Sequence, residues 1–248
     1  MNRIVIAGNW KMNKTFQEAE EFVKGLIKED LAKIDAEIQL FVPALYLKSL
    51  TELTKGSKVV IGAQNIHQEV AGAYTGEISV DMLNSIKISD TLIGHSERRQ
   101  YFNETNDIVN KKTLLALKNG IKPVVCIGET LEEREANITN QVLKTQTVEA
   151  LKDVVQADME KIIVAYEPVW AIGTGKTATA NDANEACKYV RSVVEELYGT
   201  EIAQNLVIQY GGSVKPDNVQ EILAQSDING ALVGGASLEL ASYLKLIK

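Results

Sequence analysis

Short apolar runs alternate with longer amphipathic stretches along the whole chain. The apolar runs cover residues 3–7, 38–42, 58–63, 90–94, 122–128, 161–167, 206–211 and 230–235. They are apolar throughout and do not alternate with polar residues, which is typical of strands that are buried on both faces. We therefore predict eight strands of a parallel sheet.

The stretches between these runs have helical patterns. Examples are residues 15–31, 106–120 and 181–199, and several such stretches begin with Asn, Asp or Thr and end with Gly. One strand and one helix take roughly 31 residues, the size of one crossover unit. Because no linker divides the chain, we predict a single-domain (β/α)8 TIM barrel, an α/β fold, over residues 1–248. A doubly wound open sheet is the alternative.

Composition narrows the class of protein. The 248 residues are 45% hydrophobic and 24% charged, as in soluble globular proteins. A net charge of −7 without a long basic run argues against nucleic acid and anionic membranes as partners. The apolar start is too short for a signal peptide, and no run could span a membrane. Cys126 and Cys187 lie far apart and there are two histidines, so we predict no metal site and a cytoplasmic protein with free thiols.

Unusual polar residues and glycines follow five of the predicted strands. They are Asn9 and Lys11 after the first, His95 after the fourth, Glu167 at the sixth, Ser213 after the seventh, and Gly234 with Gly235 at the eighth. In a barrel these positions share the face on which active sites are built. Any one of them could be structural, but their coincidence favours a functional site.

Glu167 is the strongest catalytic candidate. It ends a very apolar strand, and Pro168 biases it toward extended geometry. Partial burial would raise the pKa of its carboxyl and make it a better base near neutral pH. The structural alternative is a carboxylate that caps a backbone group or pairs with an arginine.

His95 is the second candidate, whereas we interpret His67 as a satisfied structural ring. His95 precedes SERRQYF, a predicted short helix, and a helix N-terminus disfavours positive charge. We therefore expect a neutral ring that donates a hydrogen bond. Lys11 and Asn9 could stabilise a developing oxyanion, or could be an exposed lysine and a turn residue. Glu97 could orient Lys11 or shuttle a proton, or it could form a surface salt bridge.

The glycine-rich segments fail the common motif tests. Trp170 occupies the position where a P-loop requires glycine, and the dinucleotide pattern that starts at Gly173 does not follow its strand directly. Ser213 lacks the glycine of a nucleophile elbow. The remaining interpretation is a phosphate site made by backbone N–H groups after the last strands. Its members are Gly173, Ser213, Gly234 and Gly235.

Six segments together resemble the triosephosphate isomerase family. They are GNWKMN, AQNIHQEVAGAYTGEIS, GHSERRQYFNE, AYEPVWAIGTGKTAT, YGGSV and GALVGGASL, and they run in the family's order from Asn9 to Leu238. Asn229 departs from the family's usual aspartate, and residues 42–47 lack its usual paired prolines. Neither departure touches the catalytic set.

The resemblance implies interconversion of dihydroxyacetone phosphate and D-glyceraldehyde 3-phosphate through an enediolate, in glycolysis and gluconeogenesis, without metal or organic cofactor. It implies Glu167 as the base and neutral His95 as the electrophile. Lys11 and Asn9 would supply charge and donors, supported by Ser96 and Glu97. The four phosphate-site residues above would hold the substrate. A lid would consist of Pro168, Val169, Trp170, Ala171, Ile172, Gly173 and Thr174.

The connection over residues 62–79 is long for a segment without clear structure, and such loops are often functional. We expect it to expose Ile66, Val70 and Tyr74. In the family this loop docks into a neighbouring subunit, with the residue that matches Thr75 near the neighbour's active site. A homodimer is therefore expected.

Two further classes of protein remain open at this stage. Another barrel enzyme could use the same phosphate site for different chemistry on phosphorylated metabolites. A non-catalytic phosphate-binding protein is less favoured, because all four catalytic candidates are present.

Overall fold

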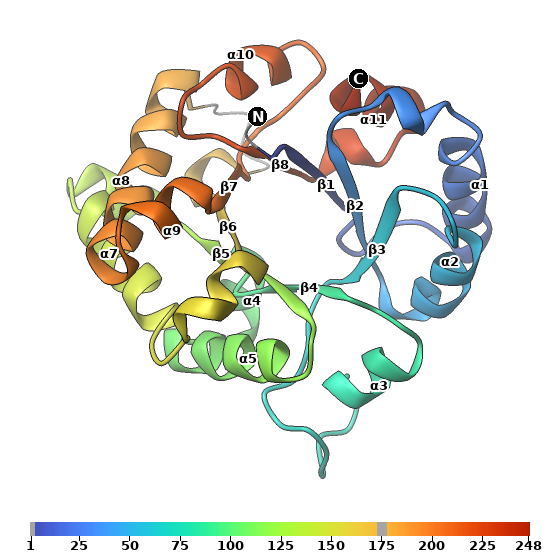
Figure 1. Cartoon of the computed structure of the whole chain (residues 1–248), viewed down its shortest axis with the longest axis horizontal. Coiled ribbons are helices and arrows are strands. Elements are labelled where there is room, and N and C mark those ends of the chain that lie inside the picture. Colours follow the sequence, from blue (N-terminus) through green and yellow to red (C-terminus); the bar gives the residue numbers. More distant parts are fainter. Residues whose placement is uncertain (1–2, 173–177) are drawn as a thin grey trace.

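A computed structural model of the chain describes residues 3–172 and 178–248. Eight parallel strands form a closed barrel in chain order, and the last strand pairs with the first (Figure 1). The strands are β1 (Val5–Asn9), β2 (Glu37–Val42), β3 (Val59–Ala63), β4 (Asp90–Ile93), β5 (Lys122–Ile127), β6 (Ile163–Tyr166), β7 (Val207–Tyr210) and β8 (Gly230–Val233). The predicted (β/α)8 barrel is confirmed, and the open sheet is excluded.

Helices follow the strands and surround the barrel (Figure 1). The α-helices are α1 (Phe16–Leu26), α2 (Leu47–Leu53), α3 (Val80–Ser85), α4 (Ser96–Phe102), α5 (Asn106–Lys118), α6 (Leu131–Glu135), α7 (Thr139–Ala150), α8 (Ala180–Tyr198), α9 (Thr200–Asn205), α10 (Val219–Leu223) and α11 (Leu240–Ile247). Short 3-10 helices are η1 (Leu31–Lys33), η2 (Ala44–Tyr46), η3 (Gln156–Lys161), η4 (Val169–Ala171) and η5 (Gly235–Ser237).

The helix ends follow from local sequence. The Thr15 hydroxyl accepts the N–H of Glu18, and the Glu18 carboxylate accepts the N–H of Thr15, which closes a capping box at the start of α1. Thr179 begins α8 in the same way, and that helix ends at Gly199 with a φ of +86°. The predicted threonine start of α1 and glycine stop of α8 are therefore confirmed, whereas α8 begins at Ala180 with Thr179 as its cap and not at the predicted Asn181.

The barrel buries both faces of its sheet. One face forms a cluster inside the barrel, made of Val5, Ala7, Phe41, Leu92, Val124, Cys126, Ile163, Ala165, Val207 and Leu232. The intervening strand residues, such as Ile6 and Val164, belong to a second cluster that also contains the buried faces of the helices. Burial on both faces explains the unbroken apolar runs in the sequence.

Closure of the barrel depends on Gly230, which lies opposite Val5 at the β8–β1 seam. Its φ is +151°, and a Cβ at this position would lie 1.9 Å from the Val5 carbonyl oxygen. Both the backbone conformation and the approach of the two strands therefore require glycine here.

Gly230→Ala is expected to lower the free energy of unfolding by at least about 3 kcal/mol, because the new methyl group would force the two strands apart. Gly56→Ala is the matched control. Gly56 also has a positive φ (+84°), but a methyl group there would meet no atom of the described chain within 4 Å beyond its own neighbours in sequence. The control should cost only about 1 kcal/mol. Urea unfolding followed by circular dichroism measures both values, and equal losses would contradict the role of Gly230 at the seam.

Candidate active site

Residues from five strand ends line one cavity of about 890 Å³ at the carboxyl end of the barrel. The predicted site residues that it brings together are Asn9, Lys11, His95, Glu167, Ser213, Gly234 and Gly235. Ile172 and Leu232 add apolar lining. The structure therefore places every described member of the predicted catalytic and phosphate-binding sets at one cavity. Gly173, the remaining predicted phosphate ligand, lies outside the described residues.

Glu167 follows β6 directly, and the residue is 2% exposed. One carboxylate oxygen lies 3.0 Å from Nε2 of His95, and the other accepts the N–H of Ser96 at 2.9 Å. Gly211 allows this placement, because a Cβ there would lie 2.8 Å from Cγ of Glu167. The carboxylate therefore contacts the second catalytic candidate and also accepts a backbone donor.

The pKa of Glu167 differs from the sequence-based expectation. Burial raises the pKa of this carboxyl, as predicted, but the neighbouring His95 and the Ser96 N–H favour the carboxylate more strongly. The net effect in this arrangement is a lowered pKa, so the predicted rise is wrong. The physical cause is that His95 and the Ser96 N–H, at the start of α4, stabilise the charged form of the carboxyl.

His95 occupies the N-cap position of α4, and its Nδ1 accepts the N–H of Glu97 at 3.2 Å. An accepting Nδ1 leaves the ring proton on Nε2, which faces Glu167. Burial lowers the pKa of His95, but the Glu167 carboxylate raises it by more, so that the net shift is upward. The expectation of a neutral ring considered the helix N-terminus alone, and the structure adds a carboxylate that acts in the opposite direction.

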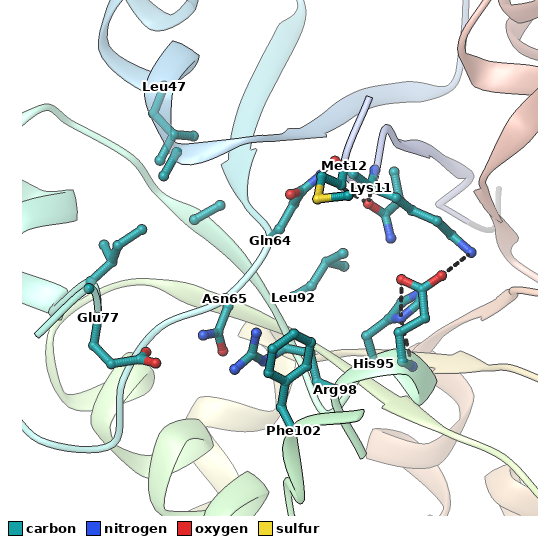
Figure 2. Close-up of a pocket in the computed structure, with 16 residues that line it drawn as sticks. Lys11, Met12, Leu47, Gln64, Asn65, Glu77, Leu92, His95, Arg98 and Phe102 are labelled. Carbon is teal, nitrogen blue, oxygen red and sulfur yellow. Dashed lines mark hydrogen bonds and ion pairs between the residues drawn. The ribbon is translucent and has the colours of Figure 1, made fainter. Parts of the chain in front are cut away.

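Lys11 has a φ of +51°, which is uncommon for a residue with a side chain. Its N–H donates to the Asn9 side-chain oxygen at 2.9 Å, and its ammonium lies 2.8 Å from a Glu97 carboxylate oxygen (Figure 2). Glu97 therefore pairs with Lys11, and because the Glu97 side chain is 40% exposed, the contact fits both an orienting role and a surface salt bridge. The lysine stem also passes close to Gly234, since its Cε would lie 3.4 Å from a Cβ at that position.

Gln64 is a site residue that the sequence analysis missed. Its side-chain amide donates to the Lys11 carbonyl oxygen at 2.9 Å and to the Asn9 side-chain oxygen at 3.2 Å (Figure 2). The Asn9 side-chain oxygen thus accepts two hydrogen bonds. The NH₂ group is therefore the part of the Asn9 side chain that can donate into the cavity. Gln64 directly follows β3, so the rule that selected the other strand-end residues could have found it.

The described part of the predicted lid, Pro168 to Ile172, includes the helix η4. The indole N–H of Trp170 donates to the buried Glu129 carboxylate at 2.9 Å, and the Arg134 guanidinium lies 4.4 Å from the centre of the Trp170 ring. Glu129 also accepts the Tyr166 hydroxyl at 3.1 Å. Glu129 and Arg134 were not predicted. Gly173 and Thr174, the remaining lid residues, lie outside the described residues.

Within residues 3–172 and 178–248, no three His, Cys, Asp or Glu side chains are grouped so that they could hold a metal ion. Within the same ranges, no helix combines the length and the apolar character needed to cross a membrane.

A closed parallel barrel with a carboxylate and a histidine in contact at the carboxyl ends of its strands is typical of (β/α)8-barrel enzymes. The triosephosphate isomerase family matches residues 4–248. Similar proteins named triosephosphate isomerase come from Caldanaerobacter subterraneus subsp. tengcongensis (52% identical over 248 residues), Thermoanaerobacter pseudethanolicus (50% over 247) and Alkaliphilus oremlandii (49% over 247). Each match covers 100% of this chain and 99% of the relative.

The chain belongs to the triosephosphate isomerase family. It is therefore an isomerase of triose phosphates, the dihydroxyacetone phosphate and D-glyceraldehyde 3-phosphate of glycolysis.

The contact between Glu167 and His95 gives a titration test. In Glu167→Gln the carboxylate charge that raises the pKa of His95 is removed, while burial still lowers it. The pKa of His95 should therefore fall relative to the wild type, and the ring should stay neutral to lower pH. NMR titration of the imidazole resonances measures this, with the only other histidine, His67, as an internal reference. An unchanged His95 titration would show that the two groups are not coupled.

Proposed function

We propose that Glu167 is the base that moves a proton between the two substrate carbons. The observation that carries the proposal is the 3.0 Å contact between its carboxylate and Nε2 of His95. A substrate that enters between the two groups would meet an acceptor for its carbon-bound proton and a donor for its carbonyl oxygen. The carboxylate takes the proton from one carbon, and the resulting carboxylic acid returns it to the next.

His95 polarises the carbonyl through its Nε2–H and then hydrogen-bonds to the enediolate oxygens. Its accepting Nδ1, bonded to the Glu97 N–H, supports this tautomer. Lys11 supplies positive charge beside the same cavity, and the NH₂ group of Asn9 supplies a further donor. Fixed charge and donors in a site shielded from water stabilise the developing oxyanion.

Backbone N–H groups of Ser213, Gly234 and Gly235 bind the substrate phosphate, together with Gly173. The cavity supports this assignment because the described three line it alongside the catalytic candidates. The segment Pro168–Thr174 covers the bound substrate as a lid. By excluding water and holding the phosphate, it would suppress loss of phosphate from the enediolate, which yields methylglyoxal.

The functional unit is a homodimer, and each subunit inserts the tip of its long loop into its partner. A second cavity of about 330 Å³ lies beside the site and is lined by Lys11, His95 and Phe102, among others (Figure 2). Val70 and Tyr74 of the loop are about half exposed, and Met12 at the cavity is 96% exposed. Such apolar exposure is typical of an interface. Ile66 was wrongly predicted to be exposed; it is fully buried in the core.

Residues 1–248 form one domain that works in the cytoplasm, where the triose phosphates of glycolysis are available. The catalysis needs neither a metal ion nor an organic cofactor, because the proposed proton transfers use side chains alone.

Glu167→Gln should lower the turnover number for glyceraldehyde 3-phosphate by roughly 10²–10⁴-fold, because the amide cannot accept the proton. Binding of a phosphorylated substrate analogue should be retained, since other groups hold the phosphate. A coupled assay and calorimetry measure the two quantities. Glu221→Gln, on the exposed side of α10, is the matched control and should keep full activity. Turnover at the wild-type level in Glu167→Gln would refute the base assignment.

Thr75→Arg should dissociate the dimer, because the exposed tip of the loop would carry an unpaired charge into the partner's cavity. Sedimentation velocity should show a shift toward monomer, and specific activity should fall as the protein is diluted. Lys55→Arg adds no charge and lies on another loop, so it should sediment as the wild type. A Thr75→Arg protein that remains dimeric at all concentrations would place the loop elsewhere.

A further inference from the structure

Lys14 follows the first-strand loop and has no role in the site described so far. Its φ is +72°, a backbone conformation that favours glycine. The Tyr46 hydroxyl donates to its carbonyl oxygen at 2.6 Å and holds the backbone in place. The contacts of its side chain are therefore of interest.

The Lys14 ammonium is held by three groups. It donates to the Leu238 carbonyl oxygen at 2.7 Å, and it lies 5.2 Å from the ring centre of Trp10 and 4.9 Å from that of Phe22. Trp10 and Phe22 are buried and pack edge to face against each other. The cation is therefore placed by a charge-assisted hydrogen bond and by two aromatic faces.

Leu238 terminates the turn that carries the two phosphate-site glycines after β8. The Leu238 N–H donates to the Gly235 carbonyl oxygen at 3.1 Å. Ser237 donates to the Gly234 carbonyl oxygen through its N–H at 2.9 Å and through its hydroxyl at 2.7 Å. Fixing the Leu238 carbonyl therefore also fixes the orientation of the preceding glycine peptides.

We propose that Lys14 is a positioning residue for substrate phosphate, acting through the turn Gly234–Leu238. The inference rests on the proposed phosphate site. The preceding residue Asn13 and the acceptor Leu238 line the cavity, but Lys14 itself does not. Lys14 thus sets the aim of the Gly234 and Gly235 N–H groups without touching the substrate. Its effect should appear in phosphate affinity and not in proton transfer.

Lys14→Met keeps the apolar stem over the two rings and removes the donor and the charge. The dissociation constant of inorganic phosphate and the KM should both rise roughly three- to tenfold, less than for loss of a direct charged hydrogen bond, because Lys14 acts through the turn. The kcat should stay within about twofold. The amide resonances of Gly234 and Gly235 should shift in the free protein. Lys14→Arg keeps a cationic donor and should restore most of the affinity.

Lys33→Met is the control for net charge. Lys33 is in η1, directly before β2, and therefore lies at the opposite end of the barrel; its side chain is 83% exposed. This variant should bind phosphate as the wild type does. If Lys14→Met does not fold, Lys14→Gly tests the same donor, because glycine accepts the positive φ.

Two results would distinguish failure of the proposed phosphate site from failure of the proposed role of Lys14. If phosphate does not perturb the Gly234 and Gly235 amides in the wild type, the proposed phosphate site is wrong and the role of Lys14 is overturned with it. If phosphate does perturb them, but Lys14→Met or Lys14→Gly binds phosphate as the wild type does, the phosphate site stands and the positioning role is refuted. A lowered melting temperature with unchanged phosphate binding would likewise refute it.

Discussion

The contact between Glu167 and His95 is the interaction on which the rest of the site depends. A carboxylate that is 2% exposed would be expected to take up a proton unless nearby groups stabilise its charge. The groups that stabilise the charge most, the imidazole of His95 and the N–H of Ser96, come from the start of α4, and Lys11 after β1 adds a smaller contribution. The charge state of Glu167 is therefore set mainly by the β4–α4 junction, on a different part of the barrel from Glu167 itself.

That junction is held in turn by residues further from the cavity. The Glu104 carboxylate accepts the N–H of Gly94 at 2.8 Å, and it pairs with the nearly buried Lys112 at 2.7 Å. Breaking a buried pair leaves an uncompensated charge and is strongly destabilising, so the pair with Lys112 holds the Glu104 carboxylate in place. The position of His95 thus depends on charge pairs in the helical shell, outside the cavity that the substrate would enter.

The fold was predictable because one physical cause dominates it. Strands buried on both faces produce unbroken apolar runs, and parallel closure brings their carboxyl ends to one face. The same reasoning located Asn9, His95 and Glu167 without any distances. It failed for Ile66, because an apolar residue in an irregular loop has no period that tells whether it faces the core. Ile66 comes soon after β3 and packs in the cluster that contains the buried faces of the helices.

The sign of the Glu167 pKa shift could not be predicted for a different reason. Burial can be anticipated from an apolar strand, but the compensating donors are about 71 residues away in the chain. Gln64 escaped notice because a glutamine has no distinctive chemistry; its role comes only from the acceptors around it. Properties of single elements were thus accessible from sequence, whereas properties of pairs required the structure.

The seam between β1 and β8 has a consequence for biosynthesis. β1 lies at the start of the chain, yet one of its two neighbours, β8, is the last strand to be made. Until β8 emerges from the ribosome, β1 presents an unpaired apolar edge that other chains could join. Asn9 ends β1 and Lys11 follows it, but Gly234 and Gly235 can join them only after all eight strands have been made. A partly synthesised chain is therefore exposed to association at this edge while its site is still incomplete.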